Sequence, residues 1–155
     1  MADNAFKIVV DDGRRRVPIE NQDGIEIGHF YFSPTDVGII QRANDMRNEF
    51  DSIVEPLEKI DIINADGTTD ESDEEKVNAI KEAENRLYEA LNKVLNADVA
   101  GAFFHDIHPF SPVDGGFYCM RVINAIVDFI NAAFEKENAK RIENIEKYTK
   151  KYNKK

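Results

Sequence analysis

The stretch GIEIGHFYFSPTD, residues 24–36, joins two differently patterned parts of the chain. Its first part carries isoleucine, isoleucine, histidine and tyrosine at every second position, an alternation that is typical of a β-strand. Ser33 and Pro34 follow at once, and such a pair is a common start of an α-helix. Asp36 strengthens the signal because a carboxylate favours the positive end of a helix dipole. The stretch therefore predicts a direct passage from a strand into a helix.

Upstream of this junction, residues 5–32 are predicted to form a β-rich head. Phe6–Val10, with the sequence FKIVV, has the composition of a strand, and Asp11–Gly13 is a turn signal. Val17–Ile19 predicts a short edge strand, because its central proline cannot donate to a ladder. Together with the alternating strand, these segments predict a three-stranded antiparallel meander. A sheet of this size is marginal alone and must pack on another element.

The first helix is predicted to follow Asp36, at the start of a helical part that covers residues 33–152. Its apolar residues recur at spacings of three and four, which mark one helical face. They are Val37, Ile40, Ala43, Met46, Phe50, Ile53, Val54 and Leu57. Pro56 is expected to end or kink this helix near Glu55.

The second helix is predicted to begin at a capping box formed by Ser72 and Glu75 and to run to about Asn96. Asp98 is then placed to cap a short helical turn. A segment with two prolines and two glycines, residues 105–116, reads as a structured loop.

The third major helix is predicted over residues 117–134. It is apolar on nearly every side, which is typical of a central helix in a bundle. A thinner apolar stripe carries the pattern outward to residue 152, and residues 153–155 are expected to fray. The predicted fold is therefore α+β, a single domain over residues 1–155 with a small N-terminal antiparallel β-meander packed on a bundle of three major helices.

Charge is unevenly distributed along the chain, which has a net charge of −10. Residues 135–155 hold eight lysines and arginines and four acidic residues, a net of +4, which leaves −14 for residues 1–134. An acidic body disfavours nucleic acid, because that affinity depends on cations that release counterions from phosphates. The basic end is either a solvated helix end or a contact for an acidic partner.

The chain shows no apolar run long enough for a membrane span and no apolar leader after its first residue, so a cytoplasmic protein is expected. Its one cysteine, Cys119, lies in an apolar run and is expected to be a buried thiol without a disulfide partner.

Catalytic signatures are lacking: there is no Gly-x-Ser-x-Gly elbow, no Walker loop and no Cys-x-x-Cys pair. A non-enzymatic protein without a cofactor is therefore expected. The strongest metal candidate is the cluster His105, Asp106 and His108, which holds two imidazoles and a carboxylate within four residues. A structural zinc site usually needs four ligands, so no metal residue is assigned, and a small metal- or ligand-binding protein that uses this loop stays the alternative.

The basic cluster Arg14–Arg16 stands out in the acidic body. It would suit a phosphate or an acidic partner surface. The simpler interpretation is a sheet edge protected by charge against unwanted strand pairing.

The segments FKIVVDDG, EIGHFYFSPTD, DMRNEFDSIVEPL and FFHDIHPFSPVDGGFY together resemble small proteins encoded among the tail genes of siphophages and prophages of Gram-positive bacteria. Those proteins are similar to tail assembly chaperones. The resemblance covers most of the chain and implies a non-enzymatic function in tail assembly. It also implies a tape-measure or tail-tube protein as the partner, in the cytoplasm of the bacterial host.

A chaperone of this kind needs exposed apolar surface for partner helices. The first helix offers the stripe Val37, Ile40, Met46, Phe50, Ile53 and Leu57 for this purpose. The competing interpretation is that this stripe packs into the protein's own core. No membrane partner is expected, and formation of a homo-oligomer is left open.

Overall fold

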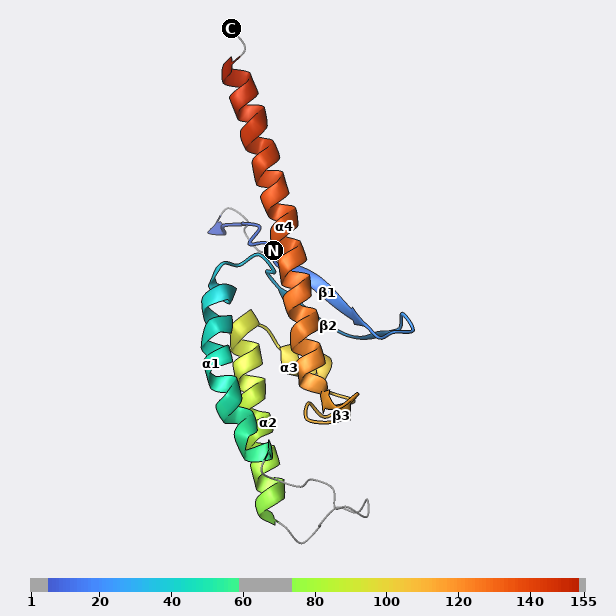
Figure 1. Ribbon diagram of the computed structural model, residues 1–155. Coiled ribbons are helices and arrows are strands. Elements are labelled where there is room, and N and C mark those ends of the chain that lie inside the picture. Colours follow the sequence, from blue (N-terminus) through green and yellow to red (C-terminus); the bar gives the residue numbers. More distant parts are fainter. Residues whose placement is uncertain (1–5, 59–73, 154–155) are drawn as a thin grey trace.

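The structure, a computed structural model, describes residues 6–58 and 74–153 of the chain. It confirms the α+β fold: a two-stranded antiparallel sheet near the N-terminus packs with three long helices and one short helix (Figure 1). The elements are β1 (Arg15–Glu20), β2 (Glu26–Phe32), α1 (Gly38–Glu58), α2 (Glu74–Leu95), α3 (Val99–Phe103), β3 (Pro112–Val113), β4 (Gly116–Phe117) and α4 (Tyr118–Asn153).

The N-terminal sheet has two strands, so the predicted three-stranded meander is wrong within the described residues. β1 pairs with β2 in a register that sets Arg15 opposite Phe32 and Ile19 opposite Gly28. Phe30 and Phe32 turn inward and stack with their ring centroids 4.9 Å apart. Phe6–Val10, the expected first strand, is exposed and joins no described strand.

The turn before β1 explains why the first strand does not pair. The Asp11 carboxylate accepts the backbone N–H of Gly13, and the Asp12 carboxylate accepts that of Arg14, each at 3.0 Å. Arg15 folds back onto both carboxylate oxygens of Asp11 at 2.9 and 3.0 Å. These local bonds compete with the backbone bond that would close a hairpin. The chain therefore leaves β1 without turning back along it.

Helix α1 starts later than its sequence signals suggest. Ser33 and Pro34 belong to a turn rather than to the first helical turn, and the Asp36 carboxylate accepts the Gly38 N–H at 2.9 Å. Asp36 is thus the residue that caps α1. The expected end near Glu55 is also displaced, because the helix runs through Pro56 to Glu58.

Helix α2 forms the centre of the core. Its buried residues, Ala83, Leu87, Leu91, Val94 and Leu95, face α1 on one side and α3 on the other. The end near Asn96 is confirmed, whereas the capping serine, Ser72, lies outside the described residues. Asp98 caps α3 as predicted, since its carboxylate accepts the Gly101 N–H at 3.0 Å.

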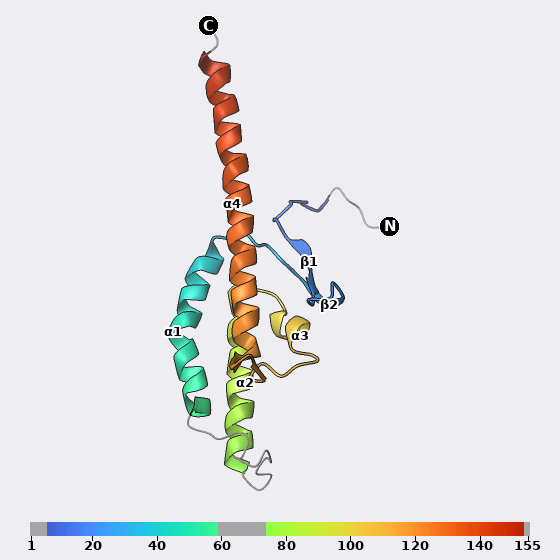
Figure 2. The same cartoon turned by 45° about the vertical axis from the view of Figure 1, so that its right-hand side comes forward.

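Helix α4 is a single helix of 36 residues that extends beyond the rest of the molecule. Its first half lies beside the other helices and its second half projects alone beyond them (Figures 1 and 2). The expectation of a helix covered on every side is wrong, because Cys119 and Val122 are the only buried apolar residues among those described in α4. Asn153 is still helical, and the end of the expected frayed tail lies outside the described residues.

Candidate partner-binding groove

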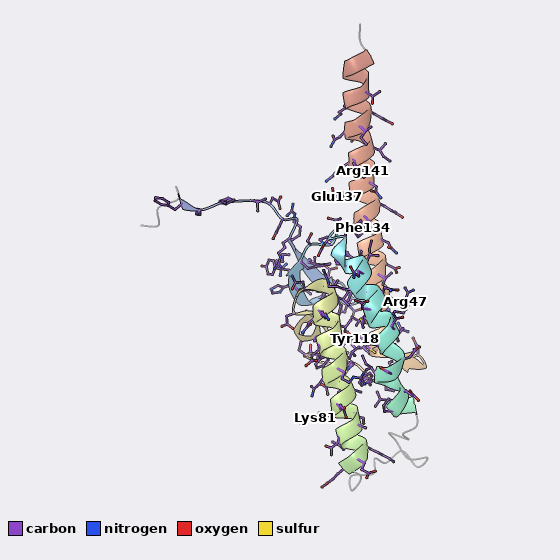
Figure 3. The ribbon with its side chains drawn as sticks, turned by 90° about the vertical axis from the view of Figure 1, so that its left-hand side faces the viewer. Arg47, Lys81, Tyr118, Phe134, Glu137 and Arg141 are labelled. Atoms are coloured by element: carbon purple, nitrogen blue, oxygen red, sulfur yellow. The ribbon has the colours of Figure 1, made fainter. Side chains whose placement is uncertain are left out.

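An apolar groove of about 420 Å³ lies between α1 and α4, with α2 as its floor. Fifteen residues line it: Ile39, Ala43, Met46, Arg47, Phe50 and Asp51 from α1, Leu91, Val94 and Leu95 from α2, and Met120, Ile123, Asn124, Ile126, Val127 and Ile130 from α4. Three of them are polar or charged. Figure 3 labels Arg47 on α1.

The wall formed by α1 is fixed to α2 at two points. Near its start, Arg42 donates from Nε to the carbonyl of Val94 at 2.9 Å and pairs with Asp36 at 2.8 Å. Arg42 and the Gly38 N–H hold the pKa of Asp36 below its usual range. Further along, Arg86 of α2 donates to the Ser52 hydroxyl at 3.0 Å. These bonds make the α1 wall and the floor one unit.

The wall formed by α4 is anchored at its N-terminal end. The Cys119 N–H donates to the carbonyl of Pro109 at 2.8 Å, and Arg121 pairs with Asp114 at 2.7 Å. Tyr118, labelled near the foot of α4 in Figure 3, packs edge-on against the buried ring of Phe104. Further up, Phe129 packs against Phe32 of the sheet. Helix α4 is thus held from its foot and from the sheet side, which leaves the groove side open.

The structure divides the stripe predicted on the first helix. Ile53 and Leu57 belong to the core, at 1% and 3% exposure. Met46 and Phe50 are half-buried and line the groove. Val37 and Ile40 are exposed outside it, at 70% and 61%. The stripe is therefore part core, part groove and part open surface.

Sequence reasoning missed the second wall of the groove. Met120, Ile123, Ile126, Val127 and Ile130 of α4 were assigned to a helix covered on every side. The signal was present, because a helix that is apolar all round needs neighbours on every side. With α1 packed against α2, α4 receives cover on only part of its surface.

The two histidines of the alternative metal site, His105 and His108, contact different groups. The Nε2 of His105 bonds the carbonyl of Ile27 at 2.6 Å, and its Nδ1 lies 3.1 Å from the Asp106 carboxylate. The Nε2 of His108 instead lies 3.1 Å from the Glu84 carboxylate, and its Nδ1 accepts a hydrogen bond from the Phe110 N–H. In the described part of the chain, no three His, Cys, Asp or Glu side chains gather as a metal-binding group.

The remaining candidate positions have local partners. Cys119 is fully buried, and burial raises the pKa of its thiol to about 11, so the thiol is protonated near neutral pH. Arg16 pairs with Glu26 across the sheet at 3.0 Å. In the same basic cluster, Arg14 pairs with Asp12 and Arg15 pairs with Asp11.

Among the helices that the structure describes, none is long and apolar enough to cross a bilayer.

Comparison of the chain with protein-family models, with curated proteins and with solved structures finds no match.

Proposed function

We propose that this chain is a non-enzymatic phage or prophage protein that acts in tail assembly through protein–protein contacts, in the cytoplasm of the bacterial host. Its partner in this proposal is the tape-measure protein, which the chain keeps soluble before assembly by holding an apolar helix in the groove. Tail-tube subunits are the second partner that the resemblance implies.

The groove is the observation that supports this proposal. It is apolar, it is bounded by two long helices, and its few polar residues, Arg47, Asp51 and Asn124, belong to its walls. An amphipathic helix binds by laying its apolar face into such a groove, while polar side chains at the margin set its register. Exposed apolar surface on a soluble chain also marks an interaction site. Val127 is 47% exposed on the α4 wall, where a partner helix would cover it.

The test is co-expression of this chain with the tape-measure protein of the same phage or prophage genome. The expected result is co-purification and a larger soluble fraction of the tape-measure protein. Val127→Glu places a carboxylate in the groove and should abolish both effects. Ile142→Glu is the matched control, because Ile142 lies on the same helix, is 55% exposed and does not line the groove.

Failure of the wild-type chain to co-purify and to raise solubility would refute the proposed function. Equal loss of binding in both variants would refute the assignment to the groove. Circular dichroism of each variant shows whether the helices remain intact.

A further inference from the structure

The segment Phe6–Val10, hereafter the arm, is an exposed apolar run at the N-terminal end of the described chain. Its four large apolar side chains are 77–96% exposed, and Figure 3 shows it pointing away from the helices. Within the described residues, the backbone of residues 7–10 belongs to no strand and makes no backbone hydrogen bond. An extended apolar segment with free donors and acceptors pairs readily with an open sheet edge.

The two edges of the sheet differ within the described residues. The outer edge of β2 is covered at Ile27 and Gly28, because the carbonyl of Ile27 accepts from His105 and Gly28 lies against the carbonyl of Ala102 in α3. Among the described residues, β1 has β2 as its only strand neighbour, and its residues are exposed or half-buried. β1 is therefore the edge at which a third strand would pair.

An apolar hollow of about 180 Å³ adjoins β1, between the sheet and α4. Its lining includes Val17 and Ile19 of β1, the rings of Phe30 and Phe32, and Phe129 of α4. Phe129 lines this apolar hollow and is nevertheless 43% exposed to solvent. A third strand beside β1 would place every second side chain over the hollow.

The arm and β1 have matching patterns. In the antiparallel register that sets Ile8 opposite Val17, Phe6 lies opposite Ile19. Both arm residues then share the face that lines the hollow. Lys7 lies opposite Pro18, which has no N–H, so the ladder lacks one bond at that position.

The arm does not reach β1 of its own chain, because Asp11 and Asp12 hold the turn in an open form. The same edge on another molecule is free to accept it. We propose that the arm of one copy adds as a third strand to β1 of a second copy, with Phe6 and Ile8 in the hollow between sheet and α4. Each copy donates one arm and accepts one, so a twofold-symmetric dimer satisfies both.

Disulfide trapping tests this exchange in the full chain. Directly opposed residues of an antiparallel ladder lie at a separation that a disulfide can span. A mixture of an Ile8→Cys chain and a Val17→Cys chain should give a covalent dimer on mild oxidation. A mixture of Ile8→Cys with Ile142→Cys is the matched control and should give none, because Ile142 is exposed, at 55%, but lies on the projecting part of α4.

Sedimentation equilibrium provides the second measurement. Ile8→Pro removes a donor from the arm and should raise the dimer dissociation constant at least about tenfold, whereas Ile142→Lys should leave it unchanged. A wild-type chain that stays monomeric at every concentration would overturn the proposal. An Ile8→Cys/Val17→Cys double variant that oxidises only within one chain would also overturn it, because the arm would then close on its own sheet.

Discussion

Helices α2 and α4 are both rich in apolar residues, but the fold treats them differently. α2 buries a continuous stripe of five residues between α1 and α3, whereas α4 buries Cys119 and Val122 and leaves Met120, Val127 and Phe129 partly exposed. The composition of a helix determines how much apolar surface it has to bury. The neighbouring elements determine how much of that surface is in fact buried. We therefore expect α2, α3 and β2, which are well covered, to contribute most to the free energy of unfolding. α4 and the arm are less covered, and these are the two elements to which our proposals assign contacts with other chains.

The largest expected effect is in α2. Leu87 is fully buried, so Leu87→Ala should lower the free energy of unfolding by about 3 kcal/mol, through lost transfer energy and the cavity left behind. Val127→Ala on α4 is the counterpart and should cost less than about 1 kcal/mol, because that side chain is half exposed already. Urea denaturation measures both. Equal losses would remove the contrast between the two helices.

A second test concerns the contact between β2 and α3. A Cβ at Gly28 would clash with the carbonyl of Ala102, which is backbone and cannot rotate away. Gly28→Ala should therefore destabilise the protein by about 1–3 kcal/mol. Gly116→Ala is the control, because nothing lies near the position of its added Cβ. If thermal denaturation gives the same midpoint for Gly28→Ala as for wild type, β2 and α3 pack less closely than described.

Removal of the projecting half of α4 should have a smaller effect. Ile142 and Ile145 are 55% and 56% exposed, and a helical segment that buries so little apolar surface adds little stability. Deletion of residues 135–155 should change the free energy of unfolding by less than about 1 kcal/mol. A loss of several kcal/mol in urea denaturation would mean that this segment supports the core.

The smallest expected effect is a pH dependence of the free energy of unfolding that arises from His105, which bonds the backbone of β2. The Ile27 carbonyl and the Asp106 carboxylate raise the pKa of His105 above its ordinary value of 6.5, because both ring nitrogens face acceptors. The contribution of the protonated ring is therefore complete below pH 6.5 and is lost as the pH rises through the raised pKa of the folded state. Free energies of unfolding measured on both sides of that window should fall with pH in the wild type more than in His105→Gln. Parallel slopes in the two proteins would contradict this role.

Sequence patterns predicted the helices better than the sheet. Helix spacing is local, so α2, its end near Asn96 and the Asp98 cap of α3 followed from neighbouring residues. The start of α1 was less well predicted, because the sequence offers helix-start signals at both Ser33 and Asp36, and in the folded chain it is Asp36 that accepts the Gly38 N–H. The short β3–β4 hairpin was not predicted, since two-residue strands carry no periodic signal: residues up to Gly116 were assigned to a loop and Phe117 to the third helix.

The candidate groove was predicted in part. Met46 and Phe50 were identified from the stripe on the first helix, whereas Val127 and Ile130 were assigned to a covered helix. Which apolar face is covered depends on contacts between segments far apart in the chain, and periodicity contains no information about those contacts.

The sequence by itself determined the α+β class, the three long helices and the acidic body with its basic end, because propensity, spacing and charge are properties of neighbouring residues. Only the tertiary structure decided that Phe6–Val10 joins none of the described strands, that the Phe30 and Phe32 face of β2 turns inward and that α4 lacks cover on one side. The physical reason is competition. Asp11 and Asp12 bond the turn before β1, and α2 packs with α1, so apolar surface of the arm and of α4 stays exposed.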